Sequence, residues 1–230
     1  MLAALFKASY NNSSDHNTEG GVCGTAFFID SKTALTAHHH FNDDAFKPNE
    51  GFSNFRYWLL LEDGKAILIK KKYLHFYPNV DTTTICFPDD VFGGENKSTA
   101  ASTEKGEDFV LKGFLASVPG NPGARVKMKW ESYDKLGIDS FDLTSVISSI
   151  NGTILDIENK TINSPDVKVQ DKDFIELSCG GNVGLSGAPL IKKDTDEIVG
   201  LMSYGLPHSV VKKDRIFAIS IGEVFKEIGL

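Results

Sequence analysis

The sequence predicts an all-β protein that ends in one helix, and three observations lead to this prediction. Short runs rich in β-branched and aromatic residues recur along the chain, bounded by Gly, Pro, Asn or Asp, which is typical of antiparallel strands. Asp63-Gly64 separates two such runs, residues 55–61 and 66–69, as in a β-hairpin. Helical periodicity is clear only in residues 222–230, where apolar residues share one side.

The remaining strands are predicted in the same way, and 230 residues with 41% hydrophobic content are ample for one cored unit. In the first half, the apolar runs 24–30 and 34–37 are joined by a polar turn, and a β-branched run follows Asp81. The polar, glycine-rich stretch between Val91 and Asp108 predicts a crossover to a second half. The strands predicted there are 109–116, 125–130, 145–157, 174–178, 188–191 and 198–204.

Composition and charge argue against several kinds of partner. A formal net charge of −7 is unsuited to nucleic acid or an anionic membrane, and no stretch is long and apolar enough to span a bilayer. The first ten residues hold one short apolar run, 2–6, without a preceding basic residue, so they lack the features of a signal peptide. The chain has three cysteines, Cys23, Cys86 and Cys179, in separate segments. An odd number is unlike the several cysteine pairs that are usual in a secreted protein. These features predict a reduced, cytoplasmic protein; a secreted one is the alternative if a signal peptide has been removed.

The stretch with the most chemical information is the glycine-rich loop at residues 180–190, G-G-N-V-G-L-S-G-A-P-L. Ser186 lies between Gly184 and Gly187, so its hydroxyl can stand out of a turn that no bulky side chain crowds. The backbone N–H groups of Gly184 and Ser186 can then point at one spot and stabilise a developing oxyanion. The alternative interpretation is an ordinary glycine-rich turn between strands.

Two upstream segments supply the other groups that a nucleophilic serine needs. The apolar run 34–37 leads into three consecutive histidines, 38–40, and a histidine at a strand end is suited to act as a general base. Asp81 opens a β-branched run and can orient an imidazole, whereas Asp89 and Asp90 follow a proline in what is typical of a turn.

With His, Asp and Ser in this chain order, the sequence resembles the trypsin/chymotrypsin-like serine peptidases, including their HtrA-like bacterial branch. The resemblance covers most of the chain and implies a single unit of two six-stranded-type antiparallel β-barrels, at about 1–100 and 107–220, followed by a C-terminal helix at 221–230. The motifs that carry it are G-T-A-F-F-I, L-T-A-H-H, D-T-T-T-I, G-L-S-G-A-P-L, I-V-G-L-M-S-Y-G and F-A-I-S-I.

The resemblance implies a role for each group of the site. Matching the family's T-A-x-H makes His39 the general base, Asp81 the carboxylate that orients it and Ser186 the nucleophile. The backbone N–H groups of Gly184 and Ser186 would form the oxyanion hole. Leu185 stands where zymogen-type members have an aspartate, so the chain is not expected to need cleavage of its N-terminus.

Substrate binding is also implied by the resemblance. Ser203 would hydrogen-bond the orienting aspartate, and Ser203, Tyr204 and Gly205 would pair with the substrate backbone by strand addition. Cys23 is where many members begin a disulfide around the catalytic histidine, but the usual partner position is His40, so that bridge cannot form.

The specificity pocket allows two interpretations. Its base would be Gly180, so the aspartate that favours Lys or Arg is absent. Arg215 stands where many members have glycine; reaching into the pocket, it would favour cleavage after Asp or Glu, because a buried arginine needs a carboxylate partner. If Arg215 instead faces solvent, a pocket lined by Gly180, Gly181 and Tyr204 would accept small or apolar side chains.

Three consecutive histidines also raise the question of a metal site. Adjacent residues of a strand point to opposite faces, so His38 and His40 would diverge from His39, and no further ligands follow at suitable spacing. We therefore expect neither a metal nor another cofactor. The expected partner is a polypeptide substrate, and a regulatory protein partner is left open. The predicted function is a serine endopeptidase, and the alternative is an inactive protease-fold module that binds peptides.

Overall fold

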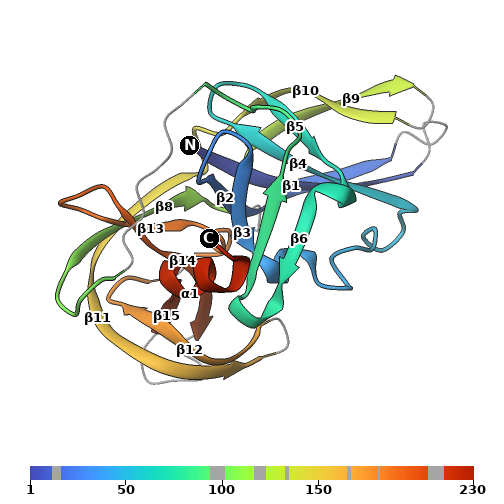
Figure 1. Cartoon of the computed structure of the whole chain (residues 1–230). Helices are drawn as coiled ribbons and strands as arrows, with labels where there is room; N and C mark the ends of the chain where they lie inside the picture. The colour runs from blue at the N-terminus through green and yellow to red at the C-terminus, as the bar shows by residue number, and fades with distance from the viewer. Residues whose placement is uncertain are drawn as a thin grey trace.

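The computed structural model describes residues 1–11, 17–93, 102–116, 123–132, 135–164, 167–180, 182–206 and 215–230. Within these ranges the chain forms two large antiparallel sheets, one separate hairpin and one α-helix at the C-terminal end (Figure 1). The predicted all-β architecture with a C-terminal helix is confirmed. Residues 94–101, in the predicted crossover, lie outside the described part of the chain.

The first large sheet has seven strands in the order β5-β4-β1-β2-β3-β7-β6. The Asp63-Gly64 hairpin joins β4 to β5 as predicted. The bounds are β1 (Leu2–Tyr10), β2 (Thr18–Phe28), β3 (Thr33–Ala37), β4 (Asn54–Leu61), β5 (Ala66–Ile69), β6 (Leu74–Tyr77) and β7 (Thr82–Cys86).

Strand β1 shows what the apolar run at the N-terminus does. It lies between β2 and β4. Ala3 and Leu5 pack into one hydrophobic core and Ala4 and Phe6 into another, so both faces of the strand are buried. A strand buried on both faces loses the polar alternation by which strands are recognised. This explains why the sequence pattern did not identify β1.

The second large sheet closes into a six-stranded barrel in the order β11-β12-β15-β14-β13-β8. Phe109, Leu111, Ile175 and Leu190 belong to one of its hydrophobic cores. The bounds are β8 (Asp108–Phe114), β11 (Ile147–Asn163), β12 (Lys168–Leu177), β13 (Pro189–Lys192), β14 (Ile198–Leu206) and β15 (Arg215–Ser220).

The separate hairpin consists of β9 (Arg125–Ser132) and β10 (Lys135–Asp142) and packs against the first sheet. The Trp130 ring meets the Tyr10 ring edge-on at a centroid distance of 5.6 Å, and Arg56 Nη1 donates to the Leu136 carbonyl at 2.9 Å. Strand β10 was not predicted. Its register shifts between Ile138 and Ser140, which breaks the two-residue alternation on which such predictions depend.

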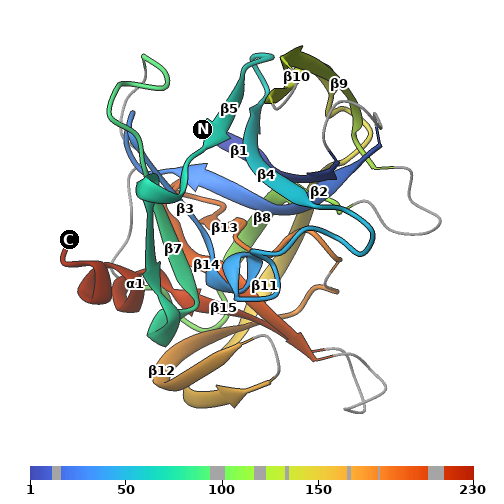
Figure 2. The same ribbon diagram turned by 90° about the vertical axis from the view of Figure 1, so that its right-hand side faces the viewer.

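A fourth core joins the two large sheets and positions the segments of the site. Phe27 and Leu35 from the first sheet share it with Phe217 from the barrel, and Val224 of α1 (Ile221–Ile228) packs there too. Both views place α1 beside the turn that joins β6 to β7 (Figure 2). No helix in the described ranges is both long and apolar enough to cross a membrane.

Candidate active site

The three histidines form η1 (His38–Phe41), one turn of 3₁₀ helix that follows β3. They therefore do not continue the strand, and the expected alternation of their side chains is wrong. The reason is Asp81: its carbonyl accepts the His38 N–H at 2.9 Å and its Oδ1 accepts the His39 N–H at 3.0 Å, which turns the chain away from the sheet. The His39 and His40 rings consequently lie together, with centroids 4.6 Å apart.

Asp81 is buried at the end of the short η3 turn (Pro78–Val80), with a side chain that is 2% exposed. Its backbone is left-handed (φ 42°), a conformation that Asp and Asn tolerate better than most residues. Its Oδ2 lies 2.9 Å from His39 Nδ1 and accepts a hydrogen bond from Ser203 Oγ at 2.6 Å. The buried carboxylate is thus held by several donors, as a buried charge requires.

The contact with Asp81 fixes the tautomer of His39. A carboxylate can only accept hydrogen bonds, so Nδ1 of His39 carries the proton and donates it to Asp81. In the neutral ring, Nε2 is then the nitrogen with the lone pair. His39 is therefore arranged to take up a proton at Nε2, and the imidazolium that results would face a buried carboxylate.

Ser186 is half-buried, and its loop has a shape that requires glycine on both sides. Gly184 (φ 99°) and Gly187 (φ 82°) have left-handed backbone conformations. A Cβ atom would overlap the backbone of Ala116 at Gly184 and the Thr25 carbonyl at Gly187. Leu185 is fully buried in the barrel core, where it anchors the loop between them.

The backbone amides of this loop fall into two groups. The N–H groups of Leu185, Gly187 and Ala188 donate to carbonyls at 3.2, 2.7 and 2.8 Å respectively. The N–H groups of Gly184 and Ser186 have no acceptor among the residues that the structure describes. These two donors are the ones that an oxyanion would need.

The first sheet holds the Ser186 loop through Thr25, which is fully buried. The Thr25 N–H donates to the Ser186 carbonyl at 3.0 Å, and Thr25 Oγ1 donates to the Gly184 carbonyl at 3.0 Å. Thr25 Oγ1 in turn accepts the Phe114 N–H at 2.9 Å, and Thr36 Oγ1 donates to the Thr25 carbonyl at 2.6 Å. Sequence reasoning missed both threonines as site residues, although both lie inside the motifs that it used.

The predicted substrate-binding residues differ in burial and in strand pairing. Ser203 is buried at an irregularity of β14, between Met202 and Tyr204, where the register with β15 shifts. Tyr204 and Gly205 pair with β15 on one side, whereas the pairing of β14 with β13 ends at Leu201. Gly180 is exposed, and Gly181 lies outside the described residues.

Arg215 is paired within the chain. Its Nε donates to Glu176 Oε1 at 2.8 Å, its Nη2 donates to Oε2 at 2.5 Å, and the guanidinium lies 5.1 Å from the centre of the Phe217 ring. The hydrogen bond from Arg215 is the main cause of the lowered pKa of Glu176. The carboxylate partner that the sequence argument demanded for this arginine is thus provided by β12. The preceding residues 207–214 lie outside the described part of the chain.

The other two histidines of η1 both have lowered pKa values. Burial lowers the pKa of His38, whose ring packs against Phe76, and it lowers the pKa of His40 from 6.5 to about 3. The proximity of His39 depresses the pKa of His40 further. Among the described residues, no three or more His, Cys, Asp or Glu side chains are grouped so that they could hold a metal ion.

The depressed pKa of His40 gives an expected pH dependence of stability. Between pH 6.5 and about 3 the unfolded chain binds a proton at this residue and the folded chain does not, so stability falls as the pH falls. One such proton changes the free energy of unfolding by about 1.4 kcal/mol per pH unit. The free energy of unfolding can be measured with urea at several pH values between about 4 and 6. We expect it to change less per pH unit in His40→Gln than in the wild type, by up to this amount. Equal pH dependences in the two proteins would contradict a His40 imidazole that stays neutral in the folded chain.

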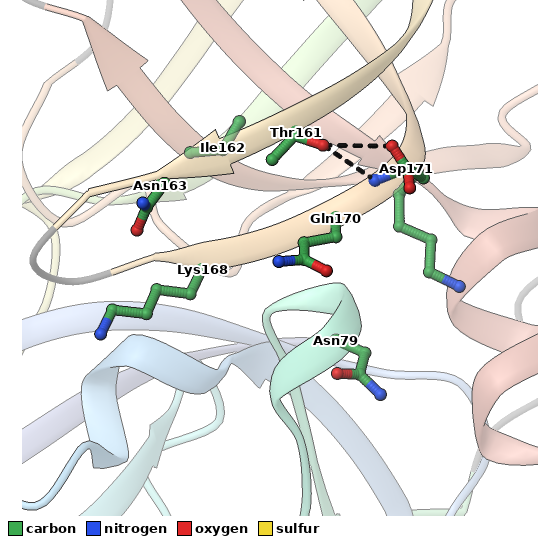
Figure 3. A pocket seen from close by; sticks show the side chains of 8 residues that line it. Asn79, Thr161, Ile162, Asn163, Lys168, Gln170 and Asp171 are labelled. Carbon is green, nitrogen blue, oxygen red and sulfur yellow. Dashed lines mark hydrogen bonds between the residues drawn. The ribbon is translucent and has the colours of Figure 1, made fainter.

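A polar cavity of about 580 Å³ lies beside η3, between that turn and the β11–β12 hairpin. Thr161 and Asp171 hydrogen-bond each other across the hairpin, and Gln170 points toward the turn that carries Asn79 (Figure 3). None of the residues predicted for the site lines it. The lining residues are Asn79, Thr161, Ile162, Asn163, Lys168, Gln170, Asp171 and Lys172.

The comparisons with known proteins agree with this geometry at the level of the fold. No protein-family model matches the sequence, and no curated protein matches it. The active form of the Rv3671c protease from M. tuberculosis is 16% identical with a TM-score of 0.59, and the match covers 98% of this chain and 79% of that one. The HtrA-type protease AlgW with a decapeptide is 14% identical with a TM-score of 0.63, over 98% of this chain and 62% of that one. The chain therefore has the chymotrypsin-like fold of the trypsin-like serine proteases.

Proposed function

We propose that the protein is a serine endopeptidase in which Ser186 is the nucleophile, His39 the general base and Asp81 the orienting carboxylate. One observation carries this proposal above the others. The His39 ring is bound to a buried aspartate on one side and packs against His40 on the other, and His40 contacts the Ser186 carbonyl at 3.2 Å. A base with a fixed tautomer therefore neighbours a ring that contacts the loop in which Ser186 stands between two left-handed glycines.

The reaction follows from these positions. Ser186 Oγ attacks the scissile carbonyl carbon while its proton moves to His39 Nε2, and Asp81 stabilises the imidazolium that forms. The carbonyl oxygen becomes an oxyanion and accepts hydrogen bonds from the N–H groups of Gly184 and Ser186. His39 then gives the proton to the leaving amine, which leaves an acyl-enzyme. In the second half of the reaction, water attacks the acyl-enzyme with His39 again as the base, and the acid product is released.

The substrate would bind as an extended peptide along β14. The edge of that strand from Ser203 to Gly205 has no partner strand on the β13 side among the described residues, so its backbone groups can pair with a peptide. Because Glu176 already neutralises Arg215, we propose that small or apolar side chains are preferred before the scissile bond. An acidic preference would require Arg215 to leave a two-pronged ion pair.

The proposal is tested by a fluorophosphonate probe, which labels an activated serine, together with peptides that carry Ala, Leu, Asp, Glu or Arg before a reporter group. We expect labelling at Ser186 and fastest turnover of the Ala or Leu peptides, with the same order in Arg215→Ala. A protein that binds these peptides but is neither labelled nor active would be a peptide-binding module instead. An acidic preference that disappears in Arg215→Ala would contradict the proposed specificity and leave the catalytic assignment standing.

A further inference from the structure

We propose that His40 is a positioning residue that holds the nucleophile loop in its reactive geometry, by donating a hydrogen bond from Nε2 to the carbonyl of Ser186. The inference rests on the proposed peptidase function, because it assigns His40 a part in placing the attacking serine. It gives η1 a second role beside the base: His39 receives the proton, and His40 fixes the group that gives it.

The contact has a defined direction. His40 Nε2 lies 3.2 Å from the Ser186 carbonyl oxygen, and a carbonyl can only accept, so Nε2 carries the proton in the neutral ring. His40 is thus the opposite tautomer to His39, whose proton is on Nδ1. In each case a hydrogen-bond partner selects the tautomer.

The ring is held in place from several sides. A side chain at Gly24 would overlap it, so the glycine provides the space that the imidazole occupies. On the main chain, the single hydroxyl proton of Tyr57 is shared between the Ala45 carbonyl at 2.7 Å and the His40 carbonyl at 3.2 Å. Cys23, on the same strand as Gly24, is a free thiol whose Sγ lies 3.4 Å from the Leu5 carbonyl. The His40 ring thus links η1 by a hydrogen bond to the Ser186 loop, which precedes β13 of the barrel.

The Ser186 carbonyl has two donors, the Thr25 N–H at 3.0 Å and His40 Nε2. A carbonyl oxygen has two lone pairs, so both can be satisfied at once. Two donors from different directions fix the rotation of the peptide plane that follows Ser186, which one donor alone would leave looser. Because the direction of Oγ depends on this backbone, a small rotation displaces the nucleophile, and a displacement of about 1 Å can cost roughly 100-fold in rate.

A neutral imidazole is suited to this place for an electrostatic reason. The His39 ring, 4.6 Å away, becomes a cation during the reaction, and a cationic donor at residue 40 would oppose that step. Burial keeps His40 uncharged, since it depresses the pKa of the ring to about 3. His40 can therefore donate a hydrogen bond without adding charge beside the base.

The test compares two substitutions of similar size. His40→Gln keeps a side-chain N–H that can reach the carbonyl, whereas His40→Met fills similar space without a donor. We expect His40→Met to lower kcat by roughly 10- to 100-fold with KM changed less than about threefold. His40→Gln should recover kcat to within about fivefold of the wild type, at a similar melting temperature to His40→Met. The matched control is His38→Met, at the ring that packs against Phe76, which should change kcat less than about threefold.

Equal kcat losses in His40→Gln and His40→Met, or wild-type kcat in both, would overturn the inference while wild-type turnover upholds the peptidase. A wild-type protein without turnover would instead overturn the proposed function, and this inference with it. Should both substitutions unfold the chain, ¹⁵N NMR of wild-type histidines decides. We expect the Nε2–H tautomer at His40 and a shift of that proton when the fluorophosphonate modifies Ser186. An Nδ1–H tautomer, or an unmoved proton, would overturn the inference.

Discussion

Replacing Ser186 by alanine is expected to abolish peptide hydrolysis, with kcat reduced roughly a million-fold, and to leave the fold unchanged. In the proposed function the Ser186 hydroxyl is the attacking group, whereas the shape of its loop depends on other features. Gly184 and Gly187 set the backbone, and the carbonyls of the loop are bound by Thr25 and His40. The comparison is of steady-state turnover, melting temperature and circular dichroism in the two proteins.

A matched control for this substitution is Ser149→Ala, at an exposed serine on the outside of β11. It should match the wild type in turnover and melting temperature. Substantial turnover by Ser186→Ala, with the control normal, would show that another group is the nucleophile. A large drop in the melting temperature of Ser186→Ala would show that the hydroxyl has a structural part as well.

Replacing His39 by alanine should lower kcat nearly as much as replacing Ser186, because a nucleophile and its base act as a unit. His38→Ala should change kcat only a few-fold, since that ring packs on Phe76 and lies 3.4 Å from Thr83 Oγ1 at its Nδ1. Turnover of one peptide by the two variants measures the difference. If His38→Ala were as damaging as His39→Ala, the assignment of the base within the three histidines would be wrong.

Asp81→Asn tests the orienting role with the least disturbance of the backbone, because asparagine also tolerates the left-handed conformation of this residue. The amide would let His39 adopt the other tautomer, and kcat should fall by roughly 10⁴-fold with the fold retained. A loss of less than about tenfold would mean that Asp81 does not select the tautomer. Retained folding is checked by the melting temperature.

The fold and the segments of the site were accessible from the sequence because they depend on local patterns. Short bounded runs predicted the strands, and the motifs around His39, Asp81 and Ser203 contain the three side chains that the structure joins in one hydrogen-bonded chain. Motifs of a few residues can carry this information, since each glycine, histidine or aspartate acts through the shape of its own turn.

The contacts that the sequence did not predict join residues that are distant in the chain and that no motif of the resemblance pairs. His40 reaches Ser186 across 146 positions, and Arg215 meets Glu176 across 39 positions. Neither pair has a periodic signature, and the pairing of Arg215 favours the small or apolar interpretation of the specificity pocket over the acidic one. The 3₁₀ turn of the histidines likewise depends on the Asp81 carbonyl, so a local pattern favoured the continuing strand.

The hydrogen bonds from Thr25 to the Ser186 loop bear on how the site assembles as the chain folds. Thr25 and Gly184 are separated by 159 positions, one of the largest separations among the hydrogen bonds of the described residues. Contacts between distant residues carry the largest loop-closure cost and are slow to form. The barrel could gain its strands while the loop still lacked the donors that the first sheet provides. The geometry of the Ser186 loop depends on these contacts with the first sheet, so under the proposed function we expect catalytic competence to require that both large sheets have formed.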